Sequence, residues 1–201
     1  MLKKCYCVLT NASYLPDFDG DVIGVDKGAW ICFKNGIEMK AAIGDFDSIS
    51  SSEKQLLQNS IKNMTILNPR KDVSDSEAAL QWAEKQGYDE IVLVTSMSGR
   101  FDHTYVNFQL VHHYDCVLMD KYNKVFLVHE GTCEIEKGNY KYISFFAREE
   151  SVVTLEGFSY PLSQYRMTAD DVLGLSNEII NKKGLVTTTG KLWCIQSNDA
   201  N

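Results

Sequence analysis

The segment Ala41-Ala42-Ile43-Gly44-Asp45-Phe46-Asp47-Ser48 joins a short apolar run to two carboxylates and a hydroxyl. In an extended or tightly turned backbone, side chains at positions i and i+2 point the same way. Asp45 and Asp47 are therefore placed to converge on one hard cation, which takes oxygen ligands. A bare Asp-x-Asp pair is also common in solvated turns, so the surrounding sequence has to distinguish a turn from a site.

Strand-like and helix-like segments alternate around this segment, up to about residue 124. Each short apolar run ends in a polar turn, and amphipathic helical patterns lie between the runs. This alternation is typical of an open parallel α/β sheet. The predicted strands are 5–10, 21–25, 41–43, 64–67, 91–95 and 117–119, and the predicted helices begin near Ala29, Ser52, Ser74 and Asp102.

The pattern changes after about residue 124. Helical periodicity ends, and short β-type runs with turn residues between them follow at 125–128, 133–135, 142–147, 152–155, 185–189 and 192–195. Such spacing is typical of a small antiparallel β-sandwich. We therefore expect two domains, an α/β nucleotide-binding domain at 1–124 and a smaller β-sandwich at 125–201, with the boundary near Asn123–Gly131.

Composition limits the class of protein. The 201 residues have a formal net charge of −7, which argues against a general nucleic-acid binder. No apolar stretch approaches the roughly 18 residues that a membrane span needs. The six cysteines form no C-x-x-C pair, which favours buried, reduced thiols. We expect a soluble cytoplasmic protein that binds neither nucleic acid nor membrane.

Four polar clusters fall at the carboxyl ends of successive predicted strands of the first domain. Each has a structural explanation, since Gly28 could tighten a turn, Ser74 and Asp102 could cap helices, and Arg100 could be a solvated charge. In open α/β sheets, however, the carboxyl edge of the strands is where ligands bind. The clusters are Asp26-Lys27-Gly28, Asp45-Phe46-Asp47-Ser48, Lys71-Asp72-Val73-Ser74-Asp75 and Ser98-Gly99-Arg100-Phe101-Asp102-His103.

Together these clusters provide the parts of a phosphoryl-transfer site. Asp45, Asp47 and Asp75 are enough to hold Mg²⁺ against substrate phosphates. Backbone N–H groups at the helix starts after Asp26 and Ser74 can receive phosphate oxygens. The chain contains no P-loop, no G-x-S-x-G motif and no histidines at zinc spacing.

The ordered motifs resemble those of the thiamine pyrophosphokinase family in its bacterial form. The resemblance spans nearly the whole chain and is specific, because the acidic motifs and the arginine motif occur in the family's order. The matching segments are Asp26-Lys27-Gly28-Ala29, Ile43-Gly44-Asp45-Phe46-Asp47-Ser48, Lys71-Asp72-Val73-Ser74-Asp75, Gly99-Arg100-Phe101-Asp102-His103, 153–162 and Leu175-Ser176-Asn177-Glu178.

The resemblance implies a homodimer that converts ATP and thiamine to AMP and thiamine diphosphate, with the thiamine site at the subunit interface. It implies Mg²⁺ ligands at Asp45, Asp47 and Asp75. Either Asp47 or Asp72 could accept the hydroxyl proton of thiamine, and Asp75 completes the group expected to act in catalysis. The implied ATP-binding residues are Asp26, Gly28, Ser48, Lys71, Arg100, Asp102 and His103, and the implied thiamine-binding residues are Ser176 and Asn177.

Three positions depart from the family pattern. Ser74 stands where threonine is usual and keeps the hydroxyl, Ser98 replaces the first of two glycines, and Ala12 replaces a glycine after the first strand. Two other functions compete with the kinase. One is a metal-dependent phosphatase that uses the Asp-x-Asp pair as its nucleophile motif, and the other is an inactive regulator that binds nucleotide or thiamine.

Overall fold

The structure is a computed structural model that describes residues 2–68 and 72–200. Contacts divide the chain into two compact units, Met1–Lys121 and Tyr122–Asn201, which we describe separately. None of the helices in the described ranges combines the length and the apolar character needed to cross a bilayer.

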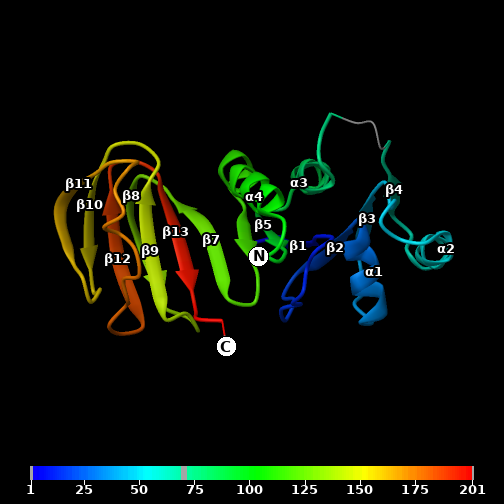
Figure 1. The fold of residues 1–201 in the computed structure, drawn as a ribbon, viewed down its shortest axis with the longest axis horizontal. Coiled ribbons are helices and arrows are strands. Elements are labelled where there is room, and N and C mark those ends of the chain that lie inside the picture. The colour runs from blue at the N-terminus through cyan, green and yellow to red at the C-terminus, as the bar shows by residue number, and fades with distance from the viewer. Residues whose placement is uncertain (1, 69–71, 201) are drawn as a thin grey trace. The chain divides into compact units, whose positions relative to one another are not determined.

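Unit 1 contains a parallel sheet with the strand order β4-β3-β2-β1-β5-β6 (Figure 1). The central strands are almost fully buried, as expected for parallel strands covered by helices on both faces. The predicted parallel α/β fold is therefore confirmed. Its strands are β1 (Lys4–Val8), β2 (Asp21–Val25), β3 (Ala41–Gly44), β4 (Met64–Ile66), β5 (Glu90–Val94) and β6 (Val117–Met119).

The helices of unit 1 cover opposite faces of this sheet. The chain steps outward from β1 to β4 and then returns to β5, beside β1, so the direction of the crossovers reverses. Because such crossovers are right-handed, the reversal places the later helices on the other face. Figure 1 shows α3 and α4 on one side and α1 on the other. The helices are α1 (Lys27–Lys34), α2 (Ser51–Ser60), α3 (Asp75–Lys85) and α4 (Phe101–Tyr114).

Side-chain caps fix the starts of α2 and α3. Ser50 accepts a hydrogen bond from the Glu53 N–H, and the Glu53 carboxylate accepts from the Ser50 N–H at 2.7 Å, which completes a capping box. The predicted cap at Ser74 is confirmed, since its hydroxyl accepts from the Glu77 N–H at 3.1 Å. These caps fix the residues at which α2 and α3 begin.

Unit 2 is the predicted β-sandwich. One antiparallel sheet has the order β7-β13-β9 and the other β11-β10-β12-β8. One apolar core joins the two sheets, with Phe145 and Cys194 from the first packed with Val153 and Val186 from the second. The strands are β7 (Asn123–Val128), β8 (Gly131–Glu136), β9 (Tyr142–Ala147), β10 (Ser151–Glu156), β11 (Leu162–Met167), β12 (Lys183–Thr188) and β13 (Leu192–Ser197).

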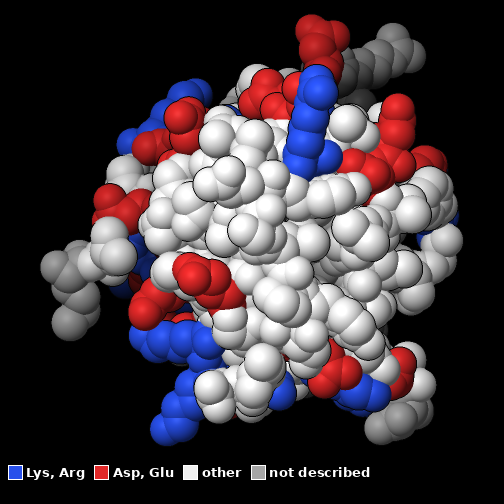
Figure 2. Space-filling view, turned by 90° about the vertical axis from the view of Figure 1, so that its left-hand side faces the viewer, with Lys and Arg blue, Asp and Glu red and all other residues white. Residues whose placement is uncertain are grey.

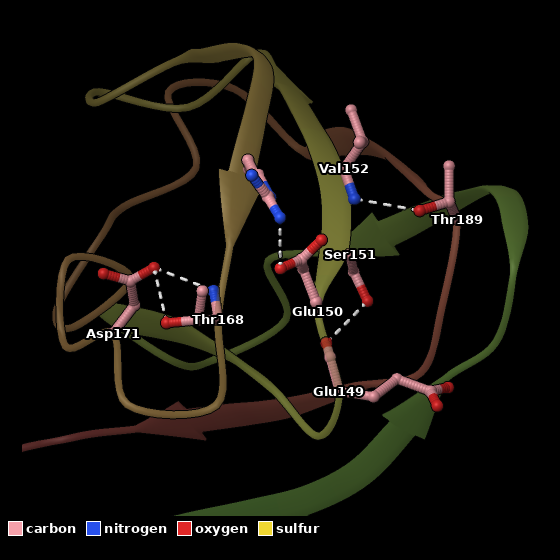
Figure 3. A network of polar contacts seen from close by, with 8 residues as sticks. Glu149, Glu150, Ser151, Val152, Thr168, Asp171 and Thr189 are labelled. Atoms are coloured by element: carbon pink, nitrogen blue, oxygen red, sulfur yellow. Dashed lines mark hydrogen bonds and ion pairs between the residues drawn. The ribbon is translucent and has the colours of Figure 1, made fainter.

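Polar contacts secure the edge of unit 2 around β10 and β11 (Figure 3). The Val152 N–H donates to the Thr189 hydroxyl at 2.9 Å, and Arg166 pairs with Glu150 at 2.7 Å. After β11, Asp171 accepts from both the N–H and the hydroxyl of Thr168, at 2.8 and 3.3 Å. The last pair of bonds anchors the loop that leads to the predicted thiamine segment.

Candidate functional site

Three carboxylates converge at the carboxyl edge of the unit 1 sheet. Because β2 and β3 are neighbours, the residues that follow them lie side by side. Asp26, Asp45 and Asp47 each offer an oxygen, and these oxygens all lie within 4.8 Å of one another. Asp26 belongs to the predicted ATP cluster, and the structure places it with the predicted metal ligands.

Asp26 is held rigidly at the end of β2. Its side chain is 5% exposed, its φ is +51°, and its N–H donates to the Ile43 carbonyl at 2.9 Å. Oxygen Oδ2 accepts hydrogen bonds from the Ser48 hydroxyl and, at 3.1 Å, from the Thr10 hydroxyl. Oxygen Oδ1 is buried and has no hydrogen-bond partner among the residues that the structure describes.

The orphaned oxygen of Asp26 tests whether these residues fit a metal ion. A buried acceptor without a donor is costly, and each such group needs an explanation. A divalent cation would satisfy this oxygen and offset the repulsion among three carboxylates. The donor set, made only of carboxylate oxygens, suits Mg²⁺, which binds through one or two carboxylates and substrate phosphates. The residues therefore fit the predicted cation.

In the turn after β3, the buried Phe46 side chain fixes the backbone between Asp45 and Asp47. Phe46, between them, has a φ of +59° and is 2% exposed within an apolar cluster that includes Leu57. The Asp47 N–H donates to Asp45 Oδ1 at 3.2 Å, and Lys54 Nζ donates to the Asp45 carbonyl oxygen at 2.8 Å. A left-handed phenylalanine is uncommon and persists only where the surroundings hold it.

The charge of this cluster affects Asp47. Asp45 foremost, then slight desolvation and the charges of Asp26 and Asp75, raise the pKa of the exposed Asp47 carboxyl above its usual value. The predicted ligand Asp75 begins α3 and is half-buried, and its oxygens are not among the three that lie within 4.8 Å. Asp75 therefore contributes to the field of the cluster in this structure.

The segment before α3 contains the remaining acidic motif. Asp72, one of the two predicted proton acceptors, is exposed three residues before Asp75. Lys71, predicted to bind ATP, lies outside the described residues. Asp72 precedes the start of α3 by three residues, and the first N–H groups of a helix have no acceptor within the helix, as an anion site at a helix start requires.

Gly28 has a packing role at the start of α1. A Cβ atom at this position would lie 1.9 Å from the Val8 carbonyl oxygen, so only glycine lets α1 approach β1 this closely. Gly28 thus lets the first turn of α1 lie close to the end of β1, and its role in ATP binding stays a prediction. Ser48 is exposed and turned back onto Asp26.

Arg100, Asp102 and His103 lie at the start of α4. The helix begins at Phe101, so the prediction that Asp102 caps it was wrong. The Asp102 carboxylate instead binds the Arg100 guanidinium through two nitrogens, with Nε–Oδ1 at 3.1 Å. Both side chains are exposed, and His103 is exposed beside them. This arrangement presents a planar cation near the sheet edge.

Sequence reasoning missed two residues that follow β1. Thr10 binds Asp26, as described above, and Asn11 ties two loops together. Asn11 Oδ1 accepts from the Thr95 hydroxyl at 2.7 Å, and Asn11 Nδ2 donates to the Ser96 carbonyl at 2.9 Å. These bonds join the loops that follow β1 and β5, at the point where the strand order reverses and ligands commonly bind. The sequence did contain a signal for these two residues, because Thr10 and Asn11 form a polar pair directly after an apolar strand.

Two departures from the family pattern have simple structural answers. The positive φ of the loop before α4, +94°, lies at Gly99, so Ser98 keeps a backbone conformation open to any residue. Ala12 is buried, and its methyl group packs in the core cluster around Tyr6 and Val8. Neither substitution strains the backbone around the site.

Unit 2 contains a pocket of about 590 Å³ that includes both predicted thiamine residues. Ser176 has a φ of +57° and is exposed, with its N–H donating to the Ser144 hydroxyl at 2.9 Å. Asn177 is buried, and its amide bonds to the N–H and carbonyl of Tyr160 and to the Glu178 N–H. Ser176 thus faces outward, whereas Asn177 uses its amide to hold the Tyr160 loop.

Comparison with known proteins identifies the family. The catalytic-domain model of thiamin pyrophosphokinase matches residues 19–126, and the vitamin B1 binding-domain model of the same enzyme matches 132–193. A thiamine pyrophosphokinase of Bacillus subtilis (strain 168) is 35% identical over 186 residues, 88% of this chain and 87% of that protein.

Solved structures give the same result. A crystal structure of thiamine pyrophosphokinase from Bacillus subtilis matches with a TM-score of 0.89 at 32% identity, over 98% of this chain and 100% of that one. The enzyme from Geobacillus thermodenitrificans matches with a TM-score of 0.87 at 29% identity, over 98% and 99%. The chain therefore belongs to the thiamin pyrophosphokinase family.

Proposed function

We propose that the protein is a thiamine diphosphokinase that transfers a pyrophosphoryl group from ATP to the hydroxyl of thiamine, releasing AMP. The observation that carries the proposal is the convergence of Asp26, Asp45 and Asp47 at the ligand edge of the sheet, in a chain that belongs to this family. Phosphoryl transfer depends on positioning and charge stabilisation more than on covalent chemistry, and this edge supplies both.

Asp26, Asp45 and Asp47 would hold Mg²⁺, with Asp75 close enough to add its charge. When bound, the ion would neutralise oxygens of the triphosphate. The start of α1 after Asp26 and the start of α3 after Ser74 offer backbone N–H donors to phosphate oxygens. Arg100 would leave Asp102 to bind the triphosphate, since a guanidinium binds phosphate and carboxylate oxygens alike.

In the reaction, the thiamine hydroxyl oxygen attacks the β-phosphorus in line. The bond between the β-phosphorus and the oxygen bridging to the α-phosphorus breaks, and AMP leaves with that oxygen. The hydroxyl proton passes to a carboxylate, either Asp47 or Asp72.

The pocket of unit 2 would receive thiamine, with Ser176 exposed to it and Asn177 holding its wall. We place this site at the interface of a homodimer. Large apolar side chains near the pocket are exposed, which is typical of surfaces that bind a partner. Figure 2 shows a broad uncharged area on one face of unit 2, with acidic and basic side chains around it. The exposed apolar residues of unit 2 are Val152, Tyr160, Val172, Leu173, Leu175 and Ile180.

The cytoplasm is the compartment that best suits this reaction. All six cysteines are free thiols, five of them buried, as is usual for proteins kept in a reducing environment. The proposed co-substrate ATP and the acidic net charge of −7 are consistent with a small-molecule enzyme rather than a nucleic-acid binder.

Product analysis tests the proposal directly. The purified chain, incubated with ATP, MgCl₂ and thiamine, is expected to release AMP and thiamine diphosphate in equal amounts. Formation of ADP and thiamine monophosphate would show attack at the γ-phosphorus. Release of inorganic phosphate without thiamine would favour the metal-dependent phosphatase, and binding of both substrates without any product would favour the inactive regulator.

A further inference from the structure

Lys54 of α2 makes contacts that the proposed reaction does not explain. Its Nζ donates a 2.8 Å hydrogen bond to the backbone carbonyl oxygen of Asp45, nine residues earlier, and lies 5.6 Å from the centroid of the Phe46 ring. The side chain is half-buried. One ammonium group therefore contacts two successive residues of the turn that presents Asp45 and Asp47.

This turn needs an external support. Phe46 has a left-handed φ of +59°, which costs free energy for a bulky residue. Burial of its ring beside Leu57 and Ile61 provides one anchor. The hydrogen bond from Lys54 provides a second, because it fixes the carbonyl that precedes Phe46.

The position of Lys54 is itself fixed by the start of α2. The capping box of Ser50 and Glu53 sets the first turn of the helix, and Lys54 is the next residue. The Lys54 N–H also donates to the Ser50 carbonyl at 2.9 Å, as the first full helical turn requires. The Lys54 side chain thus connects the capped start of α2 to the turn that contains Asp45 and Asp47.

We infer that Lys54 is a positioning residue that holds Asp45 and Asp47 in the geometry required for a divalent cation. The inference rests on the proposed function of this site. By charge alone, a cation beside three carboxylates should oppose metal binding. If Lys54 acts by positioning, its removal weakens metal binding, whereas simple electrostatics predicts that its removal strengthens it.

Lys54→Met tests whether the loss of Lys54 weakens or strengthens metal binding. Methionine keeps the unbranched stem and the helix propensity but loses both the charge and the donor. We expect Mn²⁺ titrated alone into the nucleotide-free full chain, measured by calorimetry, to bind on the order of tenfold more weakly, the scale of one hydrogen bond from a charged donor. Lys54→Arg keeps charge and donor and is expected to restore most of the affinity.

Lys62→Met is the matched control, since it removes the same charge from an exposed lysine just beyond α2. It is expected to leave Mn²⁺ affinity unchanged or slightly tighter. The second readout is turnover, where Lys54→Met should raise the Mg²⁺ concentration for half-maximal rate more than it lowers kcat. Melting temperatures in EDTA should change little, which separates positioning from general stability.

A folded Lys54→Met chain that binds Mn²⁺ as tightly as wild type, or more tightly, overturns the inference. So does a wild-type chain that binds no Mn²⁺. Lys54→Gln gives an independent arm, because it removes the charge and shortens the reach, and it too should bind more weakly. Metal binding requires no turnover, so a wild-type chain that binds Mn²⁺ but forms no thiamine diphosphate contradicts the proposed function alone.

Discussion

Gly44 lies directly against the backbone of Asp26. A Cβ atom on Gly44 would lie 2.9 Å from the Asp26 Cα and 3.0 Å from its N and Cβ. These are backbone or near-backbone atoms that cannot rotate away, and Asp26 is fixed further by its bond to the Ile43 carbonyl. The close approach of β2 and β3 at this point is what brings the three carboxylates together.

Gly44→Ala is therefore expected to displace Asp26. We predict a loss of about 1–3 kcal/mol in the free energy of unfolding, the usual cost of overpacking, and weaker binding of Mn²⁺. Urea denaturation and calorimetry measure the two effects. Gly36→Ala is the control, since Gly36 has a φ of +67° with open space around it, so it should lose stability through strain and keep its metal affinity.

Substitution of single carboxylates should separate chemistry from folding. Asp45→Asn and Asp75→Asn are expected to lower kcat on the order of 10²-fold or more, the scale of losing one electrostatic stabiliser, without lowering the melting temperature. An asparagine at position 45 keeps an oxygen to accept the Asp47 N–H. Asp17→Asn, an exposed acid of unit 1, is the charge-matched control. Wild-type turnover in Asp45→Asn would refute the metal assignment, and wild-type turnover in Asp75→Asn would show that the charge of Asp75 does not assist the reaction.

Repulsion within the acidic cluster gives a prediction about pH. The pKa of the Asp47 carboxyl is raised chiefly by Asp45. The Asp47 carboxyl therefore stabilises the folded state fully below the ordinary pKa of an aspartate, and this stabilisation is lost as the pH rises through the raised pKa. At pH 7 in EDTA, Asp47→Asn should therefore melt at a higher temperature than wild type. Added MgCl₂ should raise the melting temperature of wild type more than that of the variant. The reverse order in EDTA would show that no repulsion exists.

The alternation of strands and helices predicted the sheet of unit 1 because buried parallel strands leave a strong signal. Val22, Ile23 and Val25 are buried on both sides of β2, and the predicted range 21–25 matches that strand. Strand neighbours leave no such signal, since adjacency depends on packing of helices far along the chain. The closeness of Asp26 to Asp45 followed only from the observed order of β2 and β3.

Sequence reasoning missed the strand β11 because its residues leave no alternating pattern. Its residues Ser163, Gln164 and Arg166 are exposed, and Gln164 has a φ of +48°. An edge strand with an irregular register against β10 buries too little to produce an alternating pattern. Asp102 was assigned as a cap for a related reason, because a carboxylate near a helix start can bind backbone N–H groups or a neighbouring arginine, and sequence does not separate the two.

Thiol reactivity should single out one cysteine. Five of the six cysteines are buried, and burial raises the pKa of Cys32 and Cys116 to about 12, which leaves almost no thiolate near pH 8. Cys133 is half-buried. With an aromatic disulfide reagent, the native chain should release one equivalent of thiolate and the denatured chain six. Cys133→Ser should abolish the native reaction, and two or more fast thiols in native wild type would contradict the burial.

Ser176 and Asn177 are adjacent, yet they should respond to substitution in opposite ways. The amide of Asn177 satisfies the N–H and carbonyl of Tyr160 inside a buried setting, so Asn177→Ala should cost about 1–3 kcal/mol of stability for the groups left unpaired.

Ser176→Ala removes an exposed hydroxyl and should leave the free energy of unfolding within about 0.5 kcal/mol of wild type. If thiamine binds this pocket, Ser176→Ala should raise the KM for thiamine and leave the KM for ATP unchanged. Equal losses of stability in both variants would show that the two residues share one structural role, and an unchanged thiamine KM in Ser176→Ala would place the substrate elsewhere.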